Sequence, residues 1–196
     1  MTYGPDYVIK KLNLVELPFE GGYYRETYRS DKSVGVDYDD IENTKSNSLA
    51  NSEPNNNSRG IRSLFTHIYY LLDGERHSAL HKVRSDEVWH FYMGSTVTIY
   101  ILCDDDDNVD DGVDSGSGKL QQIRLGPDIE SGEDLHYVIK GNTWFGAELA
   151  NKSSYALLGC SVSPGFEFRD FELGKRKELV AKYPKHEWLI NKLTDG

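Results

Sequence analysis

The sequence predicts an all-β domain in which antiparallel strands form a sandwich or a barrel. Between residues 62 and 171, short segments rich in β-branched and aromatic residues are separated by Gly, Asp or Ser turns. No helical segments lie between them, which argues against β–α units and a parallel sheet. A chain of 196 residues fits one domain with a substantial core. A jelly roll of two antiparallel sheets is therefore the expected architecture.

The expected elements follow in order along the chain. A helix should begin at Gly4-Pro5-Asp6, because proline suits the first helical turn, and should end at Asn13. Alternation of side chains in Tyr23–Arg29 predicts a strand with an aromatic face formed by Tyr24 and Tyr28. Further strands are expected at Arg62–Leu72, His77–Val83, Glu87–Met93, Thr96–Cys103, Leu120–Gly126, Leu135–Lys140, Thr143–Leu149, Tyr155–Val162 and Phe166–Phe171. Helices at Leu173–Tyr183 and His186–Leu193, broken at Pro184, should pack on the barrel, within about 173–193.

Two inserts interrupt a barrel that is expected to span about residues 21–171. Residues 30–60 are rich in Asn, Ser and Asp and predict a mobile surface loop of about 31–60 whose ends lie close together. The insert at 104–119 holds seven aspartates between Asp104 and Asp114. It fits a calcium loop poorly, since Asp111 stands where the turn glycine belongs and Ser117 where the bidentate glutamate belongs. A solvated hairpin tip is the preferred interpretation.

Composition excludes several classes of function. The formal charge is −10, of which the seven aspartates of the second insert account for −7, and there is no basic stripe for nucleic acid. Neither a signal peptide nor an apolar run of the ~18 residues that a membrane span needs is found. Two cysteines do not suggest a disulfide framework. The expected location is the cytoplasm, with entry to the nucleus by diffusion in a eukaryote, and no nucleic-acid or membrane partner is expected.

One stretch, Gly74–Gly94, carries the strongest motif. His81 stands two residues before Val83, Glu87 follows four residues later, and Gly94 closes the motif. This spacing resembles the first motif of the cupins, and Ile139–Glu148 stands where their second motif belongs. Phrases typical of a poorly characterised single-domain cupin family extend the resemblance: EGGYYRETYRS, SDEVWHFYMG, TWFGAEL and GCSVSPGFEFRDFEL.

The resemblance implies a metal site inside the barrel, made of two histidines and a glutamate from the first motif and a histidine from the second. His81 and Glu87 stand in matching places, but Val83 and Trp144 occupy the other two. Valine and tryptophan are not metal ligands, and no nearby histidine is an obvious substitute. We therefore expect no metal and no cofactor, which counts against oxygen-activating chemistry.

A small-molecule pocket is the first functional hypothesis. Side chains alternate along a strand, so His81 and Glu87 should face the interior together with apolar and aromatic neighbours. Such a pocket would bind a small, mostly apolar or planar metabolite. The alternative is that these side chains simply fill the barrel. The expected ligand-binding residues are His81, Val83, Glu87, Trp89, Phe91, Trp144 and Glu148.

A metal-independent isomerase is the competing hypothesis. The chain resembles the nucleotide-sugar 3,5-epimerase branch of the cupins, which implies that His81 is the base and that Tyr24 or Tyr28 is the acid. Glu87 would orient His81 and raise its pKa. However, the epimerases have a lysine where this chain has Glu87. A diphosphate would also need cations, and the available candidates are Arg25, Arg62, Arg76 and Arg84.

A homodimer formed by sheet packing is expected as well. Alternate residues of several strands present a second apolar and aromatic face, which is seldom left in water. The residues of this face are Tyr69, Leu71, His90, Tyr92, Tyr100 and Leu102.

Overall fold

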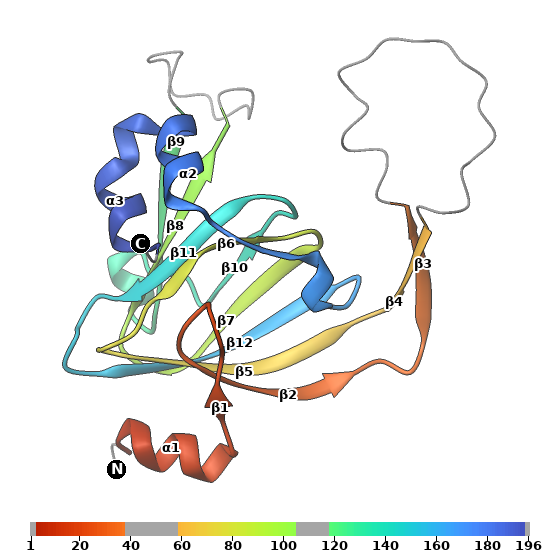
Figure 1. The fold of residues 1–196 in the computed structure, drawn as a ribbon. Helices are drawn as coiled ribbons and strands as arrows, with labels where there is room; N and C mark the ends of the chain where they lie inside the picture. Colours follow the sequence, from red (N-terminus) through yellow and green to blue (C-terminus); the bar gives the residue numbers. More distant parts are fainter. Residues whose placement is uncertain (1–2, 38–58, 105–117, 195–196) are drawn as a thin grey trace.

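A computed structural model describes residues 3–37, 59–104 and 118–194, and it confirms the all-β fold (Figure 1). All strand pairs within the sheets are antiparallel, as a jelly roll requires. The six-stranded sheet has the order β1 (Val15–Glu16), β2 (Tyr23–Arg29), β5 (Thr66–Asp73), β12 (Tyr155–Ser163), β7 (Asp86–Gly94) and β10 (His136–Ile139). The five-stranded sheet has the order β13 (Phe171–Leu173), β6 (Ser78–Val83), β11 (Trp144–Leu149), β8 (Val97–Cys103) and β9 (Lys119–Leu125).

The main core lies between the two sheets. Alternation along β8 shows how the sequence builds it: Val97, Ile99 and Ile101 point inward, while Tyr100 and Leu102 point to the outer face. Residues from both sheets, including Tyr70, Trp89 and Phe145, complete this fully buried layer. The sequence assigned Tyr100 and Leu102 to the outer face of this strand, and the structure places them there.

Helices cover the outer faces of both sheets. The helix α1 (Pro5–Leu12) packs Val8 against Leu71 and Leu157 of the six-stranded sheet. The helices α2 (Arg176–Lys182) and α3 (Glu187–Lys192), joined by the 3-10 turn η4 (Pro184–His186), cover the five-stranded sheet. Figure 1 shows α1 below the barrel, and α2 and α3 at the upper left. None of the helices in the described part of the chain is long and apolar enough to cross a membrane.

The first insert differs from its expected loop at both ends. Residues Ser33–Asp37 form β3 and Arg59–Ser63 form β4, and these strands pair with each other in a hairpin that projects from the barrel (Figure 1). A buried ion pair anchors this hairpin, because Arg62 Nη2 lies 2.7 Å from Asp170 Oδ1. Residues 38–58 of the first insert, and residues 105–117 of the second with its calcium-loop alternative, lie outside the described residues.

The segment Phe166–Phe171 was expected to be a strand and is mostly a turn. A 3-10 turn, η3 (Phe168–Asp170), precedes the short strand β13. The Asp170 N–H bonds to Glu167 O at 2.8 Å, and its carboxylate turns inward to Arg62. A further 3-10 turn, η2 (Ile129–Ser131), lies in the connection that follows β9.

The face expected to form a dimer is divided between the two sheets. Tyr100 and Leu102 lie on the five-stranded sheet beneath α2 and α3, and Leu71 is covered by α1. His90 and Tyr92 lie on the six-stranded sheet, where Tyr92 remains 42% exposed. The helices thus cover half of the surface that the sequence assigned to self-association.

Candidate functional site

A pocket of about 260 Å³ opens between the two sheets. It runs from Phe19 and Phe168, which are exposed, to His81 and Glu87, which are buried. Its walls are mainly apolar and aromatic, as is usual for small-molecule sites. They consist of Leu17, Pro18, Phe19, Ile68, Tyr70, Val83, Val162, Phe166, Phe168 and Phe171. Its polar members are Glu20, Tyr24, Glu26, Arg29, Thr66, His81, Glu87, Cys160 and Glu167.

The imidazole of His81 has a defined tautomer. Its Nδ1 lies 2.7 Å from the carbonyl oxygen of Ala79, which can only accept, so Nδ1 carries the proton. In the neutral ring, Nε2 is then an acceptor and a base. The ring is held between Phe145 and Phe171, whose centroids lie 4.2 and 5.1 Å away. His81 therefore presents a fixed acceptor in an aromatic setting.

The carboxyl group of Glu87 stays protonated at neutral pH. Burial, and then the nearby Glu20 carboxylate, raise its pKa from 4.5 to about 8, while the Trp89 indole and the Cys160 thiol oppose the shift. Burial likewise raises the pKa of the Cys160 thiol well above its ordinary value. Glu87 is thus a hydrogen-bond donor at pH 7 rather than an anion.

Glu20 enters the pocket from the loop that precedes β2. The next two residues, Gly21 and Gly22, have φ values of +99° and +74°, and a Cβ on Gly21 would lie 2.3 Å from His77 O. Only glycine tolerates this conformation and this close approach. The tight turn holds the Glu20 carboxylate against Ser78, whose Oγ donates to Oε1 at 3.0 Å. The Tyr70 hydroxyl donates to Gly21 O at 3.0 Å and fixes the same turn.

An ion-pair cluster borders the mouth. Arg29 Nε and Nη2 bond to the two carboxylate oxygens of Glu26 at 3.0 and 2.8 Å. Its Nη1 bonds to Glu167 at 3.1 Å. Phe19 and Phe168 stand beside this cluster with 78% and 60% of their surface exposed. A ligand would therefore pass two aromatic rings and a guanidinium that already has its partners.

Comparison with known proteins shows to which family this architecture belongs. Residues 6–174 match the profile described as Cupin superfamily (DUF985). The chain belongs to the cupin superfamily. No curated protein sequence matches it.

Two solved structures resemble this cupin over nearly its whole length. A protein from Shewanella oneidensis is 30% identical, with 99% of each chain covered and a TM-score of 0.74. A hypothetical protein from Leishmania major is 29% identical over 99% of this chain and 100% of its own, with a TM-score of 0.77. A dTDP sugar isomerase from Desulfovibrio desulfuricans is 15% identical over 56% of this chain and 63% of its own. With a TM-score of 0.42, this likeness does not indicate a function for the chain.

Four of the residues expected in the site lie in the pocket: Tyr24, His81, Val83 and Glu87. Glu87 was expected to orient His81, but the two make no hydrogen bond or ion pair within the described chain, and Ala79 orients the ring instead. Trp89 and Phe91 do not line the pocket, because β7 carries them away from it along the barrel. The indole N–H of Trp89 is buried without a hydrogen bond of normal geometry in the described chain.

Three other expected residues are placed elsewhere. Trp144 and Glu148 lie on the outer face of β11, beneath the C-terminal helices, because the inward positions of that strand are Phe145, Ala147 and Leu149. Glu148 accepts hydrogen bonds there from Tyr100 and Lys152 at 3.0 and 2.9 Å. Tyr28 is 53% exposed beside Phe65, because an irregularity between Glu26 and Tyr28 reverses the alternation of β2.

Sequence reasoning missed several members of the pocket. Glu20 stands in the EGG turn of the phrase EGGYYRETYRS and was not among the expected site residues. The two adjacent glycines were the available signal, since they often mark a close backbone approach. Cys160 and the phenylalanines of the mouth lie in GCSVSPGFEFRDFEL, where no residue pattern marked them as pocket residues.

The donor set does not fit the metal site that the cupin superfamily implies. Phe145 is paired directly with His81 across the sheet, and Val83 is the next inward residue of β6. Within the described residues, no group of three or more His, Cys, Asp or Glu side chains is arranged to hold a metal ion. The absence of a metal remains a prediction.

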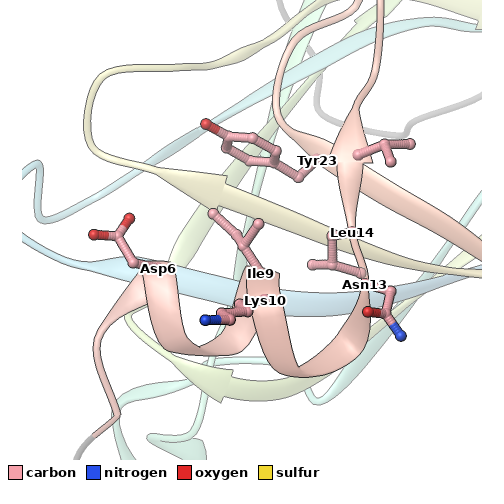
Figure 2. A pocket seen from close by; sticks show the side chains of 7 residues that line it. Asp6, Ile9, Lys10, Asn13, Leu14 and Tyr23 are labelled. Atoms are coloured by element: carbon pink, nitrogen blue, oxygen red, sulfur yellow. The ribbon is translucent and has the colours of Figure 1, made fainter.

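A hollow beside α1, shown in Figure 2, is less suited to a ligand. Its seven lining residues include Asp6, Lys10 and Asn13, all of which are exposed, and Tyr23 is half-buried. It is a surface depression between α1 and the start of the six-stranded sheet. The pocket between the sheets is the better candidate, because it reaches buried polar groups.

Proposed function

We propose that this cupin binds a small, mostly apolar or planar organic molecule in the pocket between its sheets, without a metal. The observation that carries the proposal is the meeting of buried polar groups at the inner end of an aromatic pocket. Glu87 offers a donor and His81 Nε2 offers an acceptor. Such groups in an apolar setting orient a ligand through its heteroatoms.

The proposal is tested by extracting the purified protein under denaturing conditions and identifying the retained metabolite by mass. The same metabolite should then bind to the refolded protein. His81→Ala should weaken binding roughly tenfold to a hundredfold, because one buried polar anchor contributes ~1–3 kcal/mol. His186→Ala is the matched control, since His186 contacts Gly118 O outside the pocket. Equal loss in both variants would contradict the proposed site.

A sugar epimerase or isomerase is the second candidate. It is favoured by the tautomer of His81, which leaves Nε2 ready to accept a proton, and by Tyr24 in the same pocket as the acid. The electrostatics of the pocket disfavour it. Glu20 would oppose an enolate, and the residues considered for a diphosphate do not line the pocket: Arg25, Arg62, Arg76 and Arg84.

Exchange in deuterated water separates the two candidates. Under the isomerase hypothesis, a dTDP-4-keto sugar or the extracted metabolite would gain deuterium with wild-type protein and not with His81→Ala. Under the binding hypothesis, the metabolite binds and no exchange occurs. We expect the second result.

A further inference from the structure

The charges that line the pocket indicate which class of molecule it takes, and this step rests on the proposed binding function. Four carboxyl groups line the pocket, from Glu20, Glu26, Glu87 and Glu167. In the described chain, Arg29 is the only Lys or Arg side chain that lines it. The balance of ionisable groups is therefore acidic, although the walls are apolar.

The positive charge of Arg29 is not available to a ligand. Its guanidinium is bonded to both oxygens of Glu26 and to one oxygen of Glu167, so one positive charge is shared by two carboxylates. It also donates to Phe166 O at 3.2 Å. An anionic ligand would have to displace these partners, whereas a cation would meet a mouth that already carries a net negative charge.

Glu20 lies deeper and has no cationic partner. Ser78 Oγ donates to it, and within the described chain no Lys, Arg or His forms an ion pair with it. Glu20 is half-buried, so its charge is screened less than that of a surface carboxylate. A ligand that brings its own positive charge would supply the missing partner.

Aromatic faces surround the same space. Phe19, Tyr24, Phe166, Phe168 and Phe171 line the pocket. The face of an aromatic ring attracts a cation, and more strongly where water is excluded. Aromatic walls combined with a carboxylate favour an ammonium group over a neutral group of the same size.

We propose that the ligand is a small organic cation, with a planar or apolar body that packs against the phenylalanines and a protonated amine that pairs with Glu20. A dTDP sugar and an organic acid are both anions, so they carry the opposite charge to the proposed ligand. An ammonium group in the pocket would favour the ionised form of Glu87, so binding near pH 7 should release a proton from part of the Glu87 population. The other ionisable groups at this inner end of the pocket, near Glu87, are Glu20, Tyr70, His81 and Cys160.

Three indoles that differ in the charge of the side chain test the proposal: tryptamine is a cation, tryptophol is neutral and indole-3-acetate is an anion. Titration calorimetry near neutral pH and at low salt should give tryptamine a Kd about tenfold lower than that of tryptophol, with indole-3-acetate weakest. The tryptamine titration should then be repeated in phosphate and in Tris, which differ in ionisation enthalpy. A difference in the heat of binding between the two buffers should show that binding releases protons.

Two variants locate the effect. Glu20→Gln should bring the Kd of tryptamine close to that of tryptophol. Glu130→Gln, an exposed glutamate on η2, makes the same change of net charge and should leave the preference intact. A preference that persists in Glu20→Gln overturns the pairing.

The outcomes separate this inference from the proposed function. Tryptophol or indole-3-acetate binding as tightly as tryptamine overturns the cation and leaves a pocket that binds neutral or acidic molecules. If none of the three indoles binds, the cation is overturned, and the metabolite extraction alone decides on the proposed function.

Discussion

Phe145 lies directly opposite His81 on the neighbouring strand, and their ring centroids are 4.2 Å apart. The two rings belong to β11 and β6, the strands that carry the second and the first motif. A second histidine at this position would have faced the same space as His81. The phenylalanine instead makes the surroundings of His81 aromatic, and it fixes the ring on the side away from Phe171.

We therefore expect the purified protein to contain no stoichiometric Fe, Mn, Zn or Cu. Val83 and Phe145 offer no lone pair beside His81, so the implied site lacks two of its histidine ligands. Elemental analysis of protein purified without an affinity tag that binds metals is the measurement. A stoichiometric metal that disappears in His81→Ala would refute this expectation.

Glu87 should make the folded protein less stable as the pH rises. Its pKa is raised from 4.5 to about 8, so between these values the folded state holds a proton that the unfolded chain has lost. Its stabilising contribution is complete below the ordinary pKa and is lost as the pH rises through the folded-state value. The slope for one proton is at most ~1.4 kcal/mol per pH unit.

Glu87→Gln should remove this decline, because glutamine does not titrate. Urea unfolding near the two ends of that pH range measures the change, with Glu130→Gln as the control for an exposed glutamate. An unchanged pH dependence in Glu87→Gln would show that Glu87 is ionised throughout.

Trp144 should matter for stability and not for binding. It packs beneath the C-terminal helices, with Lys82 Nζ 4.7 Å from its ring, outside the pocket. Trp144→Ala should lower the free energy of unfolding by about 3–5 kcal/mol and leave the Kd of tryptamine within about twofold. Phe171→Ala should weaken binding, since Phe171 lines the pocket and stacks on His81. Strong loss of binding in Trp144→Ala alone would refute this assignment.

The pair formed by Arg62 and Asp170 should be costly to break from either side. Both side chains are at least 94% buried, and together they join β4 to η3 at the edge of the pocket. Asp170→Asn removes the buried carboxylate that pairs with the Arg62 guanidinium and should cost about 3–5 kcal/mol in chemical unfolding. Lys175→Gln, which removes an exposed ion pair with Glu178, should leave the stability essentially unchanged.

A homodimer remains our expectation, now through the six-stranded sheet alone. His67, Tyr69, His90 and Tyr92 form an outer aromatic cluster in which Tyr92 OH lies 3.1 Å from His67 Nε2. Burial lowers the pKa of His67 and of His90, so these two imidazoles are neutral at pH 7. Sedimentation should show twice the chain mass of 22.3 kDa.

Tyr92→Glu should shift this species toward the monomer, because it places a charge in the centre of the cluster. Trp188→Glu on α3 is the control, since Trp188 is 54% exposed on the opposite side of the barrel. A wild-type protein that sediments only as a monomer at micromolar concentration would exclude the dimer.

The sequence by itself determined the sheet architecture, the terminal helices and the presence of His81, Val83 and Glu87 in the barrel. These properties follow from local patterns: alternation on strands, proline and glycine at the ends of elements, and motif spacing. Motif spacing also showed that Val83 stands in the place of a metal ligand.

The tertiary structure decided which residues complete the site. Whether Trp144 or Phe145 faces inward depends on the register of β11 against β6 and β8, and a shift of one residue reverses every side chain. The irregularity in β2 turned Tyr28 outward in the same way. Glu20 reached the pocket through a turn with positive φ values. Register and turn geometry come from contacts between distant segments, which local sequence patterns do not contain.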